Sequence, residues 1–288
     1  MEFLKTRTGE FAVGFRLGGW KWAQDLTVLI DWAKANALGV IDLGRDADGV
    51  ARVTGAGLRV GSVDLLEWQG MISADKAKRA DAVARNLDFI AKAGACNYFA
   101  VMLPEDAGKT RAENFGFMVE SLNSLASSLE KAGGRLVIEG WPGPGALCCT
   151  PEGYRAAFRE CPSMAIGINY DPSHLVRMGI DPLRFLKEFA PRVGHVHGKD
   201  TEILPDDLYE YGHELPAIWK PNPFCGASAW RYTIPGHGGT NWQEICRILV
   251  GAGYKGALCI ELEDRDYHGS EVLEKQGLID GANFLATC

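Results

Sequence analysis

Asn169-Tyr-Asp-Pro-Ser-His174 lies at the centre of the pattern from which the fold of this 288-residue sequence is predicted. The apolar run from Ala165 to Ile168 comes directly before it, and the stretch places a carboxylate at Asp171 and an imidazole three residues later. A short apolar run bounded by turn-forming residues is typical of a buried strand. We therefore predict a strand that ends at Asp171 and delivers its carboxylate to the strand end.

Three further strand-like runs end in the same way. Arg135-Leu-Val-Ile-Glu139 and Gly256-Ala-Leu-Cys-Ile-Glu261 end on a carboxylate, and Val193-Gly-His-Val-His197 ends on imidazoles. Three oxygen donors and one imidazole from separate strands suit one divalent metal ion of the Mn, Mg, Co or Zn kind. The four predicted metal ligands are Glu139, Asp171, His197 and Glu261.

Each of these carboxylates has an alternative interpretation when it is taken alone. A carboxylate at a strand end can cap the next helix or form a salt bridge at the rim. In the middle of a strand it would be a costly buried charge. Because four consecutive strands end in this way, and because the active sites of barrel enzymes lie at the C-terminal strand ends, the shared pattern favours a metal site.

Strand-like and helix-like segments alternate along the whole chain, which predicts a (β/α)8 TIM barrel. We expect residues 1–288 to form a single domain, a natural size for this fold. No Gly-x-Gly-x-x-Gly follows the first strand, which disfavours a dinucleotide-binding fold. The connection between the second and third strands is short and glycine-rich, which argues against a crossover helix there. The four earlier strands are expected at 11–17, 39–43, 58–65 and 98–103.

The composition is that of an ordinary globular protein, with 47% hydrophobic and 23% charged residues. A net charge of −7 gives no basic footprint for nucleic acid. The N-terminus lacks the apolar core of a signal peptide, and no run is long enough to span a membrane. The eight cysteines are scattered without a Cys-x-x-Cys pair, so we expect reduced thiols and a cytoplasmic protein.

Residues 201–240 interrupt the alternation. This segment is too long for an ordinary barrel loop and is rich in proline and aromatic residues. Long ordered loops of barrels are usually functional or covering elements. We predict an insertion at the rim of the active site after the seventh strand, acting as a lid or as a contact in a homo-oligomer, with Trp219 or Trp230 within reach of a ligand.

Five short motifs occur in the order in which a known family has them. No single one is specific, but together they resemble the sugar phosphate isomerase/epimerase family, a group of xylose-isomerase-like TIM barrels. The resemblance is strongest from about residue 130 to the C-terminus. The motifs are Val137-Ile-Glu139, Tyr170-Asp-Pro-Ser-His174, His195-Val-His-Gly-Lys-Asp200, Ile234-Pro-Gly-His-Gly238 and Cys259-Ile-Glu-Leu-Glu-Asp264.

The resemblance implies roles for individual residues. The metal ligands of the family fall on the four residues already chosen from the strand ends. Its substrate-contacting histidine falls on His174, and an arginine that precedes the Pro-Gly turn in ketose enzymes falls on Arg231. Lys199 either binds a substrate oxygen or is a rim charge. His195 either lines the pocket with the metal and substrate or packs behind His197.

The predicted chemistry follows from a divalent ion that polarises a ketone. A proton on the neighbouring carbon then becomes removable, and Glu139 and Glu261 are the expected catalytic groups that remove and return it. The predicted function is a metal-dependent isomerase or epimerase of a sugar, sugar derivative or inosose, acting through an enediolate. The same intermediate can expel a β-leaving group, so a lyase or dehydratase acting on a keto-sugar is the alternative.

The sequence fits two other classes of protein less well, a DNA-repair nuclease and a sugar-binding protein without catalytic activity. A DNA-repair nuclease of the endonuclease IV kind needs further histidines at the ends of the third and fourth strands. Those ends read Asp64-Leu-Leu-Glu-Trp68 and Val101-Met-Leu-Pro104, without histidine. A sugar-binding member without turnover is disfavoured by the complete set of four ligands. The expected partner is therefore a small carbohydrate, with no nucleic acid and no membrane.

Overall fold

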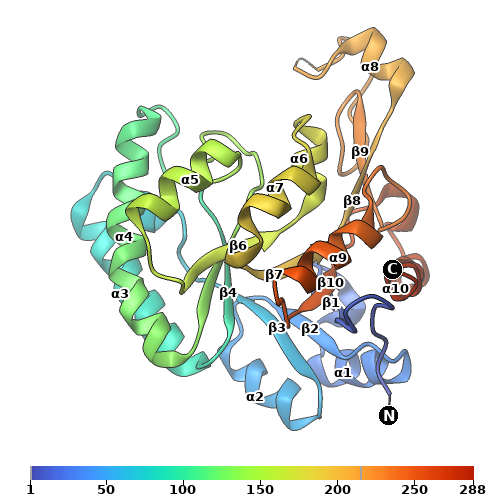
Figure 1. Ribbon diagram of the computed structural model, residues 1–288, viewed down its shortest axis with the longest axis horizontal. Helices are drawn as coiled ribbons and strands as arrows, with labels where there is room; N and C mark the ends of the chain where they lie inside the picture. The colour runs from blue at the N-terminus through green and yellow to red at the C-terminus, as the bar shows by residue number, and fades with distance from the viewer. Residues whose placement is uncertain (1, 215) are drawn as a thin grey trace. The chain divides into compact units, whose positions relative to one another are not determined.

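Eight strands close into a barrel in the computed structural model, which describes residues 2–214 and 216–288. Helices alternate with these strands along the chain (Figure 1). The predicted (β/α)8 barrel is therefore confirmed, whereas a single domain over 1–288 stays a prediction. In barrel order the strands are β1 (Ala12–Arg16), β10 (Ala257–Ile260), β7 (Val193–Gly198), β6 (Ile166–Tyr170), β5 (Arg135–Glu139), β4 (Asn97–Val101), β3 (Arg59–Asp64) and β2 (Val40–Leu43).

Most helices begin at a side chain that caps them. The helices are α1 (Leu26–Ala35), α2 (Ala47–Gly55), α3 (Lys76–Ala93), α4 (Arg111–Ala132), α5 (Pro151–Glu160), α6 (Pro172–Arg177), α7 (Pro182–Phe189), α8 (Pro205–Tyr211), α9 (Trp242–Gly251) and α10 (Glu271–Ala286). Short 3-10 turns lie at Lys21–Ala23, Gly70–Ile72, Ala190–Arg192 and Arg265–Tyr267.

The argument against a crossover helix between the second and third strands is wrong, because α2 occupies that connection. Asp46 caps it by accepting a hydrogen bond from the backbone N–H of Gly49 at 2.8 Å. Val53 is fully buried and anchors the helix. A good N-cap and one buried anchor were enough to offset the glycines of this short segment.

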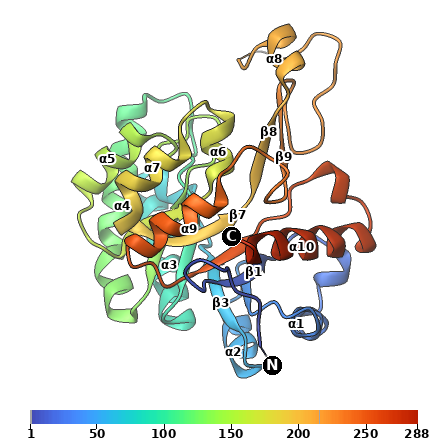
Figure 2. The same ribbon diagram turned by 45° about the vertical axis from the view of Figure 1, so that its right-hand side comes forward.

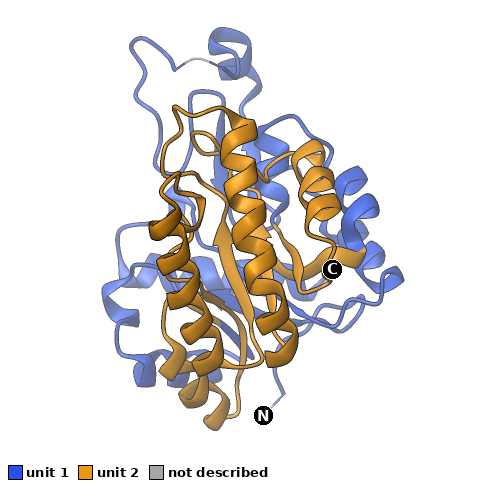
Figure 3. Ribbon diagram, turned by 90° about the vertical axis from the view of Figure 1, so that its left-hand side faces the viewer, with its two compact units in different colours: residues 1–41, 171–190, 197–288 blue, residues 42–170, 191–196 orange. Residues whose placement is uncertain are grey.

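By internal contacts the chain forms two compact units (Figure 3). Unit 1 comprises residues 1–41, 171–190 and 197–288, and unit 2 comprises residues 42–170 and 191–196. In unit 2 the parallel register pairs Glu139 of β5 with Asn169 of β6. Among the described residues, no helix is both long and apolar enough to cross a bilayer.

Helix α4 of unit 2 shows how closely sequence and structure agree in the regular part of the chain. Thr110 and Glu113 form a reciprocal capping box at its start, and Gly133 ends it with a left-handed backbone conformation (φ 69°). Its buried stripe is the one that the helical spacing of the sequence predicts. The stripe consists of Met118, Leu122, Leu125 and Leu129.

Unit 1 carries an additional element between β7 and α9. Strands β8 (Asp200–Ile203) and β9 (Trp230–Thr233) pair antiparallel as a two-stranded sheet outside the barrel. Helix α8 lies beyond the far end of this pair, away from α9 and α10 (Figure 2). The segment predicted as an aromatic insertion is thus a β-hairpin with a helical tip, in which α8 buries none of its residues.

Candidate active site

Asp171 directly follows β6 and caps α6. Its two carboxylate oxygens have different partners. Oδ1 accepts hydrogen bonds from the backbone N–H of Ser173 at 2.9 Å and from its Oγ at 2.6 Å. Pro172 fits the first helical position because it needs no backbone N–H there. Oδ2 is left for the site, where it lies 3.2 Å from Nζ of Lys199 and 3.4 Å from Nε2 of His174.

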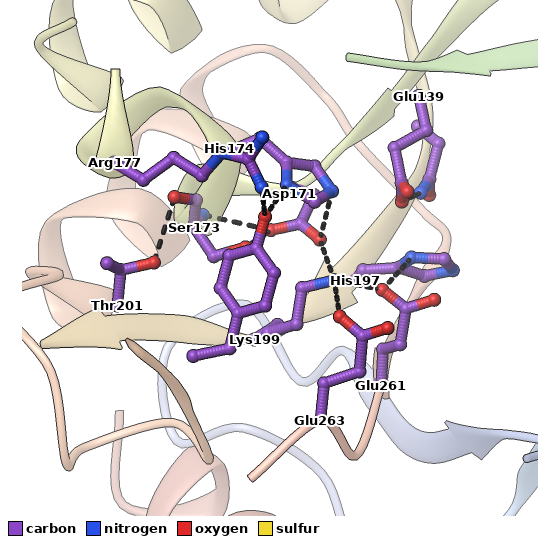
Figure 4. Close-up of polar contacts among 12 residues, drawn as sticks. Glu139, Asp171, Ser173, His174, Arg177, His197, Lys199, Thr201, Glu261 and Glu263 are labelled. Carbon is purple, nitrogen blue, oxygen red and sulfur yellow. Dashed lines mark hydrogen bonds and ion pairs between the residues drawn. The ribbon is translucent and has the colours of Figure 1, made fainter. Parts of the chain in front are cut away.

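Lys199 is the cation at the centre of the site, and its side chain is only 1% exposed. Besides Asp171, its Nζ contacts Oε2 of Glu261 at 2.5 Å and Oε2 of Glu263 at 2.9 Å. Figure 4 shows the lysine reaching between these carboxylates. A buried ammonium needs such partners, because transfer of an unpaired charge from water is very costly. Its predicted role as a substrate ligand stays a prediction.

Glu261 directly follows β10 and lies among Lys199, Arg16 and His197. Its Oε2 is 3.4 Å from Nδ1 of His197, and its Oε1 is 3.2 Å from Nε of Arg16. Burial alone would raise the pKa of this carboxyl, but Lys199, His197 and Arg16 together hold the pKa of Glu261 well below its ordinary value. The site therefore keeps an ionised carboxylate in a place from which water is largely excluded.

Arg16 is a site residue that the sequence reasoning missed. It is the last residue of β1, and β1 pairs with β10 in parallel register. The same rule that selected the carboxylates, a charged residue at the end of an apolar strand, would also have found this arginine. Arginine is not a metal ligand, so the strand-end pattern that predicts a metal site does not include it.

His174 and Arg177 of α6 meet the hairpin at Tyr232. The hydroxyl of Tyr232 lies 2.7 Å from Nδ1 of His174 and 2.6 Å from Nη1 of Arg177. Burial raises the pKa of Tyr232, and the neighbouring cations Lys199 and Arg177 only partly oppose this rise. Nζ of Lys199 also lies 4.6 Å from the centre of the tyrosine ring. One hairpin residue thus contacts three of the cationic or imidazole groups of the site.

Two predicted site residues belong to unit 2. Glu139, which is 4% exposed, ends β5 and accepts a hydrogen bond from Nδ2 of Asn169 at 2.7 Å. His195 is fully buried in β7, and its Nε2 lies 2.8 Å from Oδ2 of Asp42. The structure thus gives His195 a carboxylate partner in its own unit. The proposed roles of Glu139 as a ligand and base, and of His195 as a substrate contact, stay predictions.

Arg231 of β9 is surrounded by carboxylates. Its Nε lies 2.6 Å from Glu202, and its Nη1 lies 2.6 Å from Asp266 and 3.4 Å from Asp264. Hydrogen bonds to Glu202 and Asp266 raise the pKa of Arg231 although burial acts against them. This arginine ties the hairpin to the segment after β10. Its assignment to the substrate stays a prediction, although the structure gives it three partners within the protein.

The two tryptophans of the hairpin segment differ in their surroundings. Trp219 is 93% exposed. Trp230 packs beside Tyr232 with 4.9 Å between the ring centres, and the guanidinium of Arg177 lies 4.6 Å from its ring centre. A cavity of about 540 Å³ adjoins Glu261, and its lining includes Arg16, Trp20, Phe224, Glu263 and His268. It offers room for a small ligand next to the carboxylate.

The donor atoms of unit 1 fit a divalent ion. One potential ligand atom from each of Asp171, His174 and Glu261 lies within 4.8 Å of the other two. Two carboxylates and an imidazole are a donor set that Mn, Mg, Co and Zn share. These three side chains could therefore hold a metal ion. Sequence reasoning gave the imidazole position to His197, which stays a prediction.

A family model for xylose isomerase-like TIM barrels matches residues 28–288. The chain belongs to the xylose isomerase-like TIM barrel family.

Relatives within the family carry different names. An inosose dehydratase from Clostridium botulinum (strain Alaska E43 / Type E3) is 28% identical over 151 residues, which is 52% of this chain and 48% of that protein. The chain thus spans about half the length of this curated relative. A D-psicose 3-epimerase solved in the presence of D-fructose superimposes with a TM-score of 0.69 at 16% identity, covering 95% of this chain and 97% of that one.

A third similar structure is a xylose isomerase-like TIM barrel protein from Mycobacterium smegmatis in complex with magnesium. It has a TM-score of 0.61 and 14% identity, and it covers 96% of this chain and 97% of that one. At these identities the two structures share the fold with this member of the xylose isomerase-like family. The reaction of the present chain has to be argued from its own site.

Proposed function

We propose that this protein is a metal-dependent enzyme that transfers a proton at the carbon next to the carbonyl of a sugar or an inosose, as an isomerase or epimerase. The observation that supports the proposal most is the convergence of ligand atoms of Asp171, His174 and Glu261 within 4.8 Å of one another. Asp171 and Glu261 each directly follow a barrel strand, the position at which enzymes of this fold carry their active sites.

Asp171, His197 and Glu261 are the proposed metal ligands in unit 1, and Glu139 is the fourth ligand proposed from the sequence. A bound divalent ion supplies Lewis acidity, which makes a proton next to a carbonyl removable near neutral pH. His174, whose Nε2 lies 3.4 Å from Asp171, is available either as a further ligand or as a contact to a substrate oxygen.

The side chains of the chain would then divide the proton transfer among themselves. Glu261 takes the proton from the substrate carbon, and the electron pair of the broken C–H bond moves toward the carbonyl oxygen. Lys199 donates a hydrogen bond to a substrate oxygen from its place beside Glu261. Glu139 returns a proton on the opposite face in an epimerisation. Groups positioned in this way typically contribute factors of about 10² to 10⁴ to the rate.

A dehydratase is the second candidate, favoured by the inosose dehydratase relative. Its reaction begins with the same removal of a proton next to a ketone. It then differs because a hydroxyl group on the next carbon leaves as water and a double bond forms. Isomerase, epimerase and dehydratase therefore share the first step, and only the fate of the intermediate separates them.

The proposal is tested with a panel of ketoses and inososes in D₂O, with Mn²⁺ added to the protein. We expect deuterium at the carbon next to the carbonyl of the recovered sugar, detected by NMR and mass spectrometry. A dehydratase would instead produce an unsaturated ketone that absorbs in the near ultraviolet. The matched control is the same protein treated with EDTA. Turnover that leaves this carbon unlabelled would indicate an internal hydride shift and contradict the proton-transfer proposal.

The proposal also covers the partner, the location and the oligomeric state of the enzyme. Its partner is a small carbohydrate, as the names of its relatives suggest. A cytoplasmic location, a homo-oligomeric state and the absence of nucleic-acid partners are expectations from the sequence. Size-exclusion chromatography coupled to light scattering will test the oligomeric state directly.

A further inference from the structure

The cavity next to Glu261 is lined by aromatic side chains as well as by carboxylates. Its volume is about 540 Å³, and Trp20 and Phe224 belong to its lining. We propose that Trp20 and Phe224 form a subsite for a second, uncharged sugar ring, so that the substrate is a two-ring sugar such as a glycoside. That its reacting ring lies at Glu261 rests on the proposed function, whereas the subsite is argued from the cavity itself.

The cavity is larger than one sugar ring. A hexose has about 12 non-hydrogen atoms and would fill only about 360 Å³ even if each atom took as much space as a liquid water molecule, about 30 Å³. The cavity of about 540 Å³ therefore has room beside a single ring. Its volume also lies within the range of about 300–1,000 Å³ that is usual for small-molecule sites.

Trp20 is held from behind by a second tryptophan. Its ring stacks on that of Trp22 with 5.4 Å between the ring centres and 5° between the planes. Trp22 in turn packs edge-on against Trp32, and its Nε1 donates a hydrogen bond to Glu274 at 3.0 Å. Gly18 makes room for the ring, because a Cβ there would lie 2.5 Å from Cε2 of Trp20. A partly exposed tryptophan that is fixed in this way offers a ligand a preorganised surface.

Phe224 belongs to the hairpin segment, and its side chain is 48% exposed. Its ring stacks on His268, which also lines the cavity, with 3.8 Å between the ring centres. The next residue, Cys225, has a φ of 51°, in the left-handed region that non-glycine residues rarely adopt. Its carbonyl accepts a hydrogen bond from the backbone N–H of Tyr232 at 2.9 Å, which ties this turn to β9. Backbone strain of this kind is concentrated at functional sites.

The polar part of the lining suits an uncharged sugar. A sugar ring has an apolar C–H face, which packs on an aromatic ring, and an edge of hydroxyl groups. Among the described residues, the acidic lining consists of Glu261, Glu263 and Glu274. Arg16 and Lys199 contact the first two of these and offset two of the three charges. Carboxylates accept hydrogen bonds from hydroxyl groups but repel a phosphate, so the lining favours a neutral second ring.

The test measures the binding of sugars that have no free carbonyl and are therefore not turned over. Methyl glucopyranoside supplies one ring, and methyl cellobioside and methyl maltoside supply two rings with different linkages. Saturation-transfer difference NMR of the intact protein with Mg²⁺ gives each affinity and shows which ring contacts aromatic side chains. We expect at least one disaccharide to bind at least about threefold more tightly than the single ring, as one aromatic contact supplies.

Three variants and one charged ligand complete the experiment. Phe224→Ala and Trp20→Leu each remove one aromatic surface and should weaken disaccharide binding by about three- to tenfold. Trp219→Ser is the matched control, since this tryptophan of the same hairpin segment is 93% exposed and lies outside the described lining of the cavity. It should leave binding unchanged. Methyl cellobioside with a phosphate on its outer ring should bind more weakly than the neutral sugar.

The outcomes decide the proposal in either direction. Equal affinities for one ring and two rings, or no binding of either disaccharide, overturn it. Unchanged disaccharide binding in both Phe224→Ala and Trp20→Leu does so too, and tighter binding of the phosphorylated sugar overturns the uncharged ring. If Trp20→Leu does not fold, the wild type and Phe224→Ala still decide. A preference for two rings that either variant loses supports the proposal. Because none of these sugars is turned over, the result is separable from failure of the proposed function.

Discussion

Unit 1 contains two clusters in which a cation contacts three carboxylates. The two clusters differ in how deeply their side chains are buried. Lys199 contacts Asp171, Glu261 and Glu263, and its side chain is 1% exposed. Arg231 contacts an equally acidic set, Glu202, Asp264 and Asp266, but two of these carboxylates are 39% and 54% exposed. The first cluster lies at strand ends, and the second joins the hairpin to a surface turn.

The number of ion pairs around a cation therefore does not identify a functional site. Exposed pairs gain little because water and salt screen them and because ordering the side chains costs entropy. Buried pairs are costly to form and still more costly to break. A buried cluster therefore makes a stronger case for function, and the following predictions test whether the two clusters really differ in this way.

Lys199→Met should have the largest effect on stability. The substitution removes the ammonium that contacts the carboxylates of Asp171 and Glu261. Breaking a buried ion pair typically costs about 3–5 kcal/mol. Urea denaturation in EDTA measures this loss, and added Mn²⁺ should restore part of it. The control is Lys220→Met, which removes a partly exposed pair with Asp207 and should cost about 1 kcal/mol or less. Equal stability of the two variants would contradict the comparison.

Glu261→Gln should have the largest effect on turnover. It keeps an oxygen donor but removes the base, so the rate should fall by at least the roughly hundredfold expected of general-base catalysis. Steady-state kinetics on the substrate found in the D₂O panel measures this. Metal content, determined by elemental analysis, should fall less than turnover does.

Glu263→Gln is the matched variant, because Glu263 shares the contact with Lys199 but its side chain is 38% exposed. We expect its loss of turnover to be much smaller than that of Glu261→Gln. Near-normal turnover of Glu261→Gln would refute its role as a base and leave the metal site untouched.

Arg231→Met should have a modest effect that depends on salt. Partly exposed pairs contribute about 0–1 kcal/mol each, so we expect a stability loss on the order of 1 kcal/mol at low salt. Screening should shrink this loss at about 1 M salt, where the Debye length falls to about 3 Å. A raised KM without any loss of stability would instead support the sequence prediction that Arg231 binds substrate.

Trp219→Ser should have the smallest effect. Its side chain is 93% exposed, and surface substitutions of this kind usually change stability by less than about 0.5 kcal/mol. Thermal denaturation at two protein concentrations measures this. A loss of stability that grows with protein concentration would show that the tip of the hairpin is a contact between copies of the chain.

The barrel and the charged residues at its strand ends could be predicted from the sequence. Apolar runs ending on Asp171 and Glu261 could be read directly, because a strand places its last side chain at a predictable edge of the sheet. Helix α4 could be read for a similar reason, since its caps and buried stripe are local. These features depend on a few neighbouring residues, and their periodicity remains visible without the fold.

The partners of these residues, in contrast, could be identified only in the folded protein. The contact of Tyr232 with His174 joins positions far apart in the sequence, and no local pattern predicts it. Arg16 meets Glu261 because β1 pairs with β10. Arg231 is placed among three carboxylates because the insertion folds as a hairpin. Charges and hydrogen bonds act through short distances in space, so their pairing becomes defined only once the chain has closed.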